Sequence, residues 1–489
     1  MTRNDQSPLF VWDGECGFCR FWVLRWRAGL GELVRFAPYQ EVGDRFPEIS
    51  EEAFRHSAKL IEEDGTVREA AAAVFRLLSL GPGPGILWWL HRRIPPFRWT
   101  AEAAYRWIAD HRSLAARATR LFWGRDPAPP TFATSARMVS RAVALVYLVA
   151  FLSLAVQARG LIGPEGILPA GEYLDAVGRA TGGGVAGILR APTLAWLAPG
   201  GGGLVALCAA GAAASLALFL EVVPLVSAAA AWVLYLSLQS VGQAFLSFQW
   251  DILLLEAGFL LLFLVPARGS RARLERFLPP TAASGERDRG ARGGPWFPAI
   301  WLFWWLLFRL VFESGLVKLA GGDPVWRDLT ALAHHYESQP IPNPLAWYAH
   351  QLPVGIHRLS TLLTFVVELG VPFLFFLPRR PRILGGLLVI GHQAAILLTG
   401  NYTFFNLLTI AVALSLFDDG AWRALLGRLP GGLRAAGGGE TAAAGGDEGG
   451  LASGCSLGFA GRLRRGATAA FLAVAVAVGA GQLVRSAGS

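Results

Sequence analysis

Two kinds of hydrophobic pattern divide this chain. Up to about residue 125, short apolar runs alternate with charged and polar residues, which is typical of a soluble α/β fold. After Arg137, apolar runs of membrane-spanning length recur. They cover residues 138–157, 204–221, 224–240, 251–266, 297–313, 360–378, 383–399, 402–417 and 467–484. The pattern predicts an all-α transmembrane region of eight or nine helices behind a soluble N-terminal region.

The N-terminal region predicts a small mixed fold. Apolar runs predict strands and helices, and Asp64-Gly65 predicts the tight turn of a hairpin. The expected elements are a strand at Leu9–Trp12, a helix at Phe21–Ala28, a strand at Leu33–Ala37, a strand at Ala58–Glu62 before the turn, and a helix at Arg68–Leu78.

Two cysteines lie three residues apart where the first strand leads into the first helix. The stretch is Asp13-Gly14-Glu15-Cys16-Gly17-Phe18-Cys19-Arg20. Unpaired N–H groups and the helix dipole favour a thiolate at Cys16. Cys19, one turn further on, is placed to attack a mixed disulfide formed by Cys16. Arg20 favours the thiolate and the two acidic residues oppose it, so the direction of the pKa shift stays open.

Two other uses of the cysteine pair stay open. A CxxC motif can supply half of a zinc site, although two more ligands are needed and no second CxxC or histidine pair lies nearby. In the second alternative both thiols are buried structural groups. Redox chemistry is favoured, with Cys16 as the nucleophile and Cys19 as the resolving thiol.

These elements and this motif carry a resemblance. Strand, CxxC, helix, strand, hairpin and helix follow each other as in a thioredoxin-like domain. Asp-Gly-x-Cys-x-x-Cys-Arg after an N-terminal strand resembles the DCC family of thiol-disulfide oxidoreductases, over about the first 125 residues. The resemblance gives Cys16 and Cys19 the redox role, with Asp13, Gly14 and Arg20 in support. Thioredoxins place a cis-proline opposite the CxxC; here about His56-Ser57 takes that place, so this contact is expected to be built differently or to be absent.

Composition agrees with a membrane protein. Of 489 residues, 53% are hydrophobic and 16% charged, which does not fit a soluble domain. The net charge of +9 comes almost entirely from arginines beside apolar runs, so basic flanks of spans explain it better than nucleic-acid binding. Four cysteines, with Cys208 in an apolar run and Cys455 in a Gly/Ala-rich loop, exclude a disulfide framework. Residues 1–30 lack the features of a signal peptide.

Arginine placement predicts the orientation of the spans. Basic clusters lie at residues 112–141, 268–292, 379–382 and 423–465, and they alternate with loops that carry few basic residues, at 158–203, 241–250, 314–359 and 400–401. With the N-terminus inside and nine spans, every basic cluster faces the cytoplasm, as the positive-inside rule requires. The dithiol domain is therefore expected in the cytoplasm and the sparsely charged loops outside.

Ionisable residues within the spans have two interpretations. They are Asp251 and Glu256 near or inside one span, Glu313 and Lys318 in another, and Glu368 in a third. Charges at membrane depth are costly and face a partner or a cavity. They therefore form buried ion pairs that fix helix packing, or they work directly on a ligand or client. Trp, Tyr and Pro crowd residues 322–350, which suits an interfacial lid.

Three long motifs follow in order on the sparsely charged face. They are FLSFQWDILLLEAGF, GDPVWRDLTALAHHYESQPIPNPLAWYAH and LTGNYTFFNLLTI. Over about residues 137–420 the chain resembles the lipase maturation factor family. The membrane-domain positions singled out, none with an established catalytic role, are Trp250, Asp251, Glu256, Glu313, Lys318, Asp323, Trp326, Arg327, Asp328, His335, Tyr336, Glu337, Trp347, Tyr348, Asn401 and Asn406.

The resemblance implies a maturation factor. Animal members are membrane proteins of the endoplasmic reticulum, needed for the folding and assembly of secreted dimeric lipases. They continue into a lumenal region where this chain has a Gly/Ala tract, residues 437–450, and one more apolar segment, and they lack such a redox domain. These departures and the Arg/Ala/Gly bias predict a bacterial inner-membrane protein. Expected partners are membrane lipid, a client such as a secreted lipase or hydrolase, and a thiol or disulfide partner protein; no cofactor, metal or nucleic acid is expected.

A second resemblance supplies an alternative function. Glu313 to Trp326, with Lys318 ahead of Asp-x-x-Trp, is similar to the segment of vitamin K-dependent carboxylases that carries a catalytic lysine. It implies a membrane enzyme with Lys318 as general base, its pKa lowered by a low-dielectric site. A nearby carboxylate argues against this role because it stabilises the charged lysine.

The chain is thus expected to be built from five parts. These are a dithiol domain (1–125), a Pro/Ala-rich linker (126–136), a transmembrane domain (137–420), a Gly/Ala/Arg-rich cytoplasmic segment (421–465) and a terminal transmembrane helix (466–489).

Overall fold

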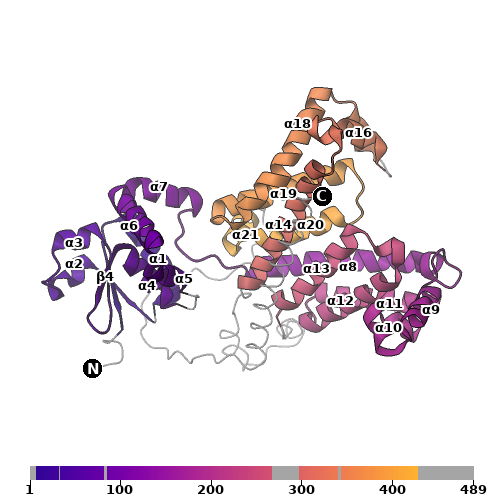
Figure 1. Cartoon of the computed structure of the whole chain (residues 1–489), viewed down its shortest axis with the longest axis horizontal. Coiled ribbons are helices and arrows are strands. Elements are labelled where there is room, and N and C mark those ends of the chain that lie inside the picture. The colour runs from indigo at the N-terminus through magenta and orange to yellow at the C-terminus, as the bar shows by residue number, and fades with distance from the viewer. Residues whose placement is uncertain (1–6, 32, 82–84, 267–296, 340–342, 428–489) are drawn as a thin grey trace. The chain divides into compact units, whose positions relative to one another are not determined.

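The computed structural model describes residues 7–31, 33–81, 85–266, 297–339 and 343–427. These form two compact units, each described below by itself (Figure 1). The first runs to Pro130 and takes in Pro378–Pro381, and the second begins at Thr131. The predicted arginine cluster at 268–292, the Gly/Ala tract, Cys455 and the apolar segment 467–484 lie outside the described residues.

A four-stranded sheet organises the first unit. Its order is β2-β1-β3-β4, with β1 parallel to β2 and antiparallel to β3, and β3 antiparallel to β4. The strands are β1 Leu9–Trp12, β2 Arg35–Pro38, β3 Lys59–Ile61 and β4 Val67–Glu69. The helices are α1 Gly17–Leu30, α2 Tyr39–Val42, η1 Gly43–Arg45, α3 Glu51–His56, α4 Ala70–Ser79, α5 Ile86–Arg93, α6 Pro95–Asp110 and α7 Arg112–Phe122. The parallel pair requires a crossover, which α1 provides.

Each face of this sheet has its own apolar core. Phe10 points to one face with Val23 of α1 and Leu77 of α4. Its neighbour Val11 points to the other face, with Phe54 of α3. Successive side chains of a strand point to opposite faces, so the apolar residues of β1 serve both cores. The sheet is therefore covered on both sides, and the loop after β1 is held at its edge.

The predicted order of elements in the first unit is observed, and two of the boundaries that differ from the prediction have a clear physical cause. Helix α1 begins at Gly17, four residues before the predicted start at Phe21, because Cys16 already caps it. The helix expected from Arg68 begins at Ala70, because residues 67–69 pair with β3 as strand β4. The Asp64-Gly65 turn joins β3 to β4, a short strand that the apolar pattern did not indicate.

The second unit is helical. Six of its described segments are long and apolar enough to span a membrane: α8 Ala133–Ile162, α11 Gly201–Phe219, α12 Pro224–Val241, α14 Phe297–Ala320, the segment Val354–Phe376 and α19 Arg379–Thr399. A seventh is possible if α20 Phe405–Ala413, η7 Leu414–Leu416 and α21 Asp419–Leu426 form one span, although they bend by 109°. The remaining helices are α9 Ala170–Thr181, α10 Gly184–Arg190, η2 Leu194–Leu197, η3 Gln243–Leu246, α13 Gln249–Leu264, α15 Pro324–Arg327, α16 Ala331–Ser338 and α17 Pro344–His350.

The expected count of eight or nine spans is not reached within the described residues. The predicted span at 251–266 is helix α13, whose 16 residues rise about 24 Å, less than the roughly 30 Å of a hydrocarbon core. Val265, just before Pro266, leaves the helix, since a residue before proline disfavours helical geometry.

A proline also reshapes the predicted span at 360–378. Helix α18 Val354–Phe365 continues into a π-turn, η5 Val366–Gly370, and a 3₁₀ turn, η6 Val371–Phe376. Pro372 lacks the N–H that would bond to the carbonyl of Glu368, and its ring crowds that carbonyl. Glu368 therefore lies where the regular helix ladder is interrupted, a position often found at functional sites.

The long helix α8 lies at the centre of the second unit. It packs against α11, α12, α13 and α20 (Figure 1). Tyr147 of α8 donates its hydroxyl to the carbonyl of Leu254 on α13, at 2.9 Å. Gly258 makes this approach possible, because a Cβ there would lie 1.9 Å from the Tyr147 hydroxyl. The packing brings α13 into the core of the bundle.

Candidate functional site

Cys16 and Cys19 lie at the N-terminus of α1. Cys16 is the N-cap residue, with extended backbone, and its Sγ accepts the backbone N–H of Cys19 at 3.4 Å. A cap sulfur in this position receives the positive end of the helix dipole. Both cysteines are free and partly buried. The structure therefore brings the two predicted redox residues together in the expected order.

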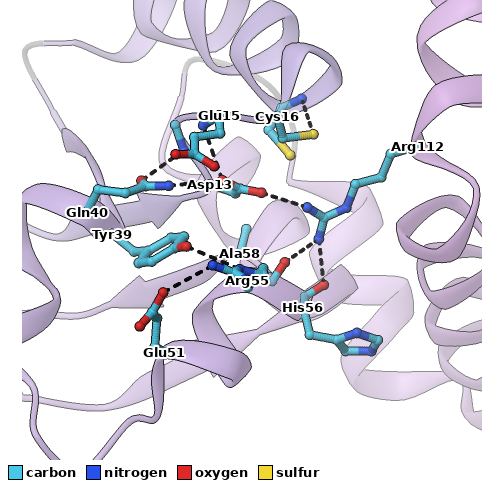
Figure 2. A network of polar contacts seen from close by, with 12 residues as sticks. Asp13, Glu15, Cys16, Tyr39, Gln40, Glu51, Arg55, His56, Ala58 and Arg112 are labelled. Atoms are coloured by element: carbon cyan, nitrogen blue, oxygen red, sulfur yellow. Dashed lines mark hydrogen bonds and ion pairs between the residues drawn. The ribbon is translucent and has the colours of Figure 1, made fainter.

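Asp13 fixes the loop that precedes the cap. Its Oδ1 accepts the backbone N–H of Glu15 at 3.2 Å and the side-chain amide of Gln40 at 3.1 Å (Figure 2). Gln40 in turn accepts the N–H of Gly14 at 3.1 Å. A Cβ at Gly14 would come within 2.8 Å of the Cβ of Pro38. These contacts tie the motif loop to the end of β2, and they assign Asp13 and Gly14 a structural task.

Arg112 links the motif to a distant segment. Its Nη1 donates to Asp13 Oδ2 at 2.9 Å, and its Nη2 donates to the carbonyl of His56 at 3.0 Å and to that of Arg55 (Figure 2). The segment at His56-Ser57, which takes the place of the thioredoxin proline, is thus joined to the motif through a guanidinium. The sequence left two outcomes open, a contact that is built differently or one that is absent. The structure shows a contact that is built differently.

The environment separates the acidities of the two thiols. A side-chain hydrogen bond from Cys19 is the main cause that lowers the pKa of Cys16 from its ordinary value of 9.0 to about 6, and the backbone N–H of Cys19 and the charge of Arg112 add to it, against partial burial. The pKa of Cys19 is raised, because it donates to Cys16 and is more deeply buried. Cys16 is therefore the thiolate at neutral pH, and Cys19 holds its proton.

Sequence reasoning assigned the stabilising cation to a different residue. Arg20 is exposed, and among the described residues its guanidinium has no hydrogen bond or ion pair. Arg112 is 99 positions away from Asp13 and opens helix α7. No local sequence pattern around Arg112 indicates that it contacts the cysteine motif. The one sign in the sequence was its place among the basic residues before the first span.

A shallow hollow lies beside the sulfurs. Its lining includes Phe18 and Cys19 of α1, Phe54 of α3, and Tyr105 and Arg112. Tyr105 accepts the backbone N–H of Ala58 at 2.9 Å, and burial raises its pKa to about 12. A second hollow begins next to Cys16, at Gly17, and is lined by Phe21 of α1 with Ala116, Thr119, Arg120 and Arg125.

In the second unit, Lys318 pairs with a carboxylate on another segment. Its Nζ lies 2.8 Å from both carboxylate oxygens of Glu368 and donates to the carbonyl of Ser314 at 3.2 Å. It also lies 5.4 Å from the ring centre of Trp326. His392 Nε2 is 3.7 Å from Glu368. The interrupted helix thus presents Glu368 as the counter-charge of Lys318.

Other predicted polar residues of the spans also have partners. Asp251 Oδ1 accepts the hydroxyl of Tyr235 at 2.6 Å, while its Oδ2 is buried without a hydrogen bond. Glu256 forms an ion pair with Arg309, and Glu313 Oε1 is buried without a hydrogen bond. Asn406 donates to Gln393 at 2.7 Å. The ion pairs of Glu256 and Lys318 are partly buried, and the choice between a structural role and direct work on a ligand or client stays a prediction.

The predicted lid residues are split between a bonded set and an exposed set. His335 Nε2 lies 3.0 Å from the hydroxyl of Tyr402, and Glu337 lies 3.5 Å from His350 Nε2. Burial and the charge of Lys318 lower the pKa of His335. Trp347 and Tyr348 contact each other and are 62% and 65% exposed.

The remaining motif positions have local tasks or are open to solvent. Asp323 caps α15 by accepting the N–H of Val325 at 3.1 Å, and Arg327 donates to the carbonyl of Leu319 at 3.4 Å. The ring of Tyr336 lies beside that of His357, and the ring of Trp250 stacks on Phe248. The side-chain oxygen of Asn401 accepts the N–H of Thr403 at 3.3 Å. Asp328 is exposed. No three His, Cys, Asp or Glu side chains come together as a metal site in the part of the chain that the structure describes.

Comparison with known proteins defines the class of both units. Residues 134–424 match the lipase maturation factor transmembrane domain, and residues 10–118 match the DCC1-like thiol-disulfide oxidoreductase domain. The chain belongs to the lipase maturation factor family and carries a DCC1-like domain. It is an integral membrane protein by its family and its apolar helices.

The curated relatives are lipase maturation factors of animals. Lipase maturation factor 2 of Gallus gallus is 46% identical over 293 residues, which cover 57% of this chain and 38% of the relative. That of Homo sapiens is 46% identical over 287 residues, with 57% and 39% covered. Lipase maturation factor 1 of Bos taurus is 39% identical over 329 residues, with 66% and 54% covered. The chain thus spans about two fifths of the lipase maturation factor 2 relatives. No solved structure matches.

The carboxylase alternative is not supported. The membrane domain matches the lipase maturation factor model, and Lys318 lies against the carboxylate of Glu368. An adjacent carboxylate favours charged lysine, whereas a general base must lose its proton. The geometry therefore agrees with the family match.

Proposed function

We propose that this chain is a membrane-bound maturation factor whose dithiol exchanges disulfides with a partner protein on the same side of the membrane. The single observation that carries the redox part is the unequal environment of the two thiols. Cys16 caps α1 with its pKa lowered to about 6, whereas Cys19 is covered and keeps its proton. A nucleophile and a resolving thiol need this difference.

The proposed exchange has two steps. The Cys16 thiolate attacks a disulfide of the other protein, so that a Cys16 mixed disulfide forms and one thiolate leaves. Cys19 then gives its proton to solvent or to that thiolate and attacks the Cys16 sulfur. A Cys16–Cys19 disulfide forms, the second thiolate leaves, and two electrons have passed to the other protein. The reverse sequence oxidises a dithiol, and a thiol or disulfide partner protein resets the pair.

The hollow beside Cys16 supports a place for the other protein. It combines the aromatic floor of Phe18 and Phe21 with the cations Arg120 and Arg125. An extended segment with an apolar and an acidic side chain fits this lining. Asp13, Gly14 and Arg112 hold the loop and the cation in place; in this proposal they are positioning residues and Cys16 and Cys19 are the catalytic ones.

The membrane domain is proposed to hold the client. The relatives are named lipase maturation factors, which supports a secreted lipase or another hydrolase as client. The exposed Trp347 and Tyr348 are suited to client contact, whereas the ion pairs of Lys318 and Glu256 are suited to holding the helices. The proposed parts are those expected from the sequence: 1–125, 126–136, 137–420, 421–465 and 466–489.

We also propose that the chain lies in a bacterial inner membrane with the dithiol domain in the cytoplasm. The arginine clusters support this orientation. It requires α13 to cross the membrane although it is short. If α13 did not cross, the cluster at 268–292 would face outward, and the lid, which follows the span α14, would face the cytoplasm.

Glutathione disulfide tests the redox proposal on the full chain in lipid nanodiscs. The Cys19→Ser variant should retain one glutathione on Cys16 at pH 7, seen by peptide mass spectrometry. The wild type should pass on to the internal disulfide, and the matched Cys16→Ser variant should retain far less glutathione. Capture on Cys19 in preference to Cys16, or no capture at all, would contradict the proposal.

The client side has its own test. Deletion of the chain in its host should lower the activity of a secreted hydrolase without lowering the amount of its transcript. Restoring the chain with Cys16→Ser and Cys19→Ser separates the two roles: recovery of the hydrolase would show that the membrane domain acts without the dithiol. An unchanged set of secreted hydrolase activities in the deletion strain would reject the maturation role.

A further inference from the structure

Helix α6 turns tryptophan and arginine outward together. Trp99 and Trp107 are 65% and 53% exposed, and the exposed Arg106 lies beside Trp107. At 3.6 residues per turn, positions 99, 106 and 107 lie on one side of the helix. Large exposed apolar side chains in register along a helix indicate an interaction surface.

Helix α7 repeats this combination. Leu114 and Leu121 are 50% and 62% exposed, and Phe122 is 39% exposed. The exposed Arg117 lies between the two leucines on the same side of the helix. We name the outward surface of the two helices, formed by Trp99, Arg106, Trp107, Leu114, Arg117 and Leu121, the α6–α7 face.

The charge around this face is strongly positive. Residues 86–125 hold eight arginines and two carboxylates, Glu102 and Asp110. Glu102 is turned inward, where it accepts the N–H groups of Ala71 and Ala72 and lies 3.0 Å from His91. Almost all the charge presented outward by this segment is therefore cationic.

The opposite sides of the same helices serve the dithiol site. Tyr105 of α6 bonds to Ala58, and Arg112 at the start of α7 bonds to Asp13. None of the residues that define the α6–α7 face lines either of the two hollows at the dithiol site.

We propose that the α6–α7 face lies on the headgroup layer of an anionic bilayer. Trp and Leu suit the interface between water and hydrocarbon, and arginines suit lipid phosphates. A basic amphipathic surface of this kind holds the dithiol domain at the membrane surface, within reach of clients that are themselves in the membrane.

The chain itself supports a bilayer as the occupant. Residues 123–132 join α7 to α8, the first candidate span, and ten residues reach about 35 Å at full extension. Arg25 donates to the carbonyls of Pro127 and Ala128 at 3.4 and 3.2 Å, which shortens the free linker further. A lipid surface is therefore always within reach of the first unit, whereas a protein partner would have to be recruited.

Photo-crosslinking in nanodiscs tests this inference on the full chain. p-Benzoylphenylalanine is placed at Trp107 or Leu121, and at exposed Val67 of β4 as the control site. One set of nanodiscs contains phosphatidylcholine alone, and the other contains one part phosphatidylglycerol to two parts phosphatidylcholine. Lipid adducts should form several-fold more at 107 and 121 than at 67, and several-fold more with phosphatidylglycerol.

Charge reversal supplies the matched comparison. Arg106→Glu with Arg117→Glu should lower the adducts at Trp107 several-fold, and Arg27→Glu with Arg45→Glu, the same change at exposed arginines elsewhere in the first unit, should not. Equal adducts at all three sites would overturn the inference. Crosslinks from 107 and 121 to a second copy or to another protein, in place of lipid, would also overturn it.

Discussion

At the scale of the residue, one guanidinium connects three parts of the candidate site. Arg112 bonds to Asp13 of the motif loop and to the carbonyls at residues 55 and 56 (Figure 2). Its charge is also one cause of the low pKa of Cys16. A residue placed in this way positions the nucleophile and favours its ionised form.

Replacing this guanidinium should raise the pKa of Cys16. Arg112→Met is expected to move the pH of half-maximal Cys16 alkylation upward from about 6, by roughly one unit as for the loss of one nearby charge. Arg112→Lys keeps a positive charge at this position, so the pKa of Cys16 should stay close to its wild-type value. Arg117→Met, on the outer side of α7, should leave the pKa of Cys16 unchanged. An unchanged alkylation profile for Arg112→Met would remove this residue from the account.

The same pKa predicts how the stability of the reduced protein depends on pH. The folded thiol of Cys16 ionises near pH 6 and the unfolded thiol near its ordinary 9.0. Between these values the unfolded state binds more protons, so stability rises with pH from about 6 to 9 and this contribution is lost as the pH falls through 6. Thermal unfolding of the wild type against Cys16→Ser measures it: the difference between their melting temperatures should grow over this range.

The pair of Lys318 and Glu368 should behave as a coupled structural unit. Glu368→Gln leaves the lysine without its counter-charge in a partly buried place, and Lys318→Met does the same to the carboxylate, so each should destabilise the protein by about 3–5 kcal/mol. The double variant should be less destabilised than the sum of the two. Melting temperatures in detergent, analysed as a double-mutant cycle, measure this; strict additivity would show that the two side chains do not act together.

Residue roles could be predicted from the sequence only where they are local. Asp13, Gly14, Cys16 and Cys19 lie within seven consecutive residues, and their spacing was enough to place them. Arg112 was missed because it reaches the motif from 99 positions away. The partner of Lys318 was only one of several candidates, since nothing in the sequence states that the π-turn presents Glu368 to it.

At the scale of the element, helix α13 is the test of the membrane orientation. Its 16 residues are short for a span, yet eight of them are buried and it packs between α12 and α14. Its one described ion pair joins Glu256 to Arg309 of α14. The arginine clusters alternate correctly only if it crosses.

Reporter insertions should show that α13 crosses. A fluorescent or phosphatase reporter inserted after Pro280 is expected to report the cytoplasm, and the same reporters after Pro199 should report the outside. An outside result at both positions would mean that α13 stays on one side, and the proposed orientation of every later segment would be reversed.

Element boundaries deviated from the sequence pattern where proline or capping intervened. Pro266 ends α13 early, and Pro372 turns one predicted span into helix, π-turn and 3₁₀ turn. Cys16 starts α1 four residues sooner than the apolar run indicated. Hydropathy locates apolar segments well, but it does not include backbone N–H groups, and these decide where a helix ends or is interrupted.

At the scale of the whole molecule, hydropathy alone separated the chain into a soluble and a membrane part. The two family matches, at residues 10–118 and 134–424, fall on these parts. What the pattern did not provide is the relation between them, because two units with separate cores impose no pattern on each other's sequence. Whether the two parts act together is therefore tested by experiments in the host cell.

Trapping in the host tests most sharply whether the Cys16 thiolate attacks a disulfide of a partner protein on its own side of the membrane. Cys19→Ser should accumulate mixed disulfides that disappear on reduction and that contain a partner protein, identified by mass spectrometry. The control with both Cys16→Ser and Cys19→Ser should accumulate none. No trapped protein in the single variant, or the same species in the double variant, would contradict the account.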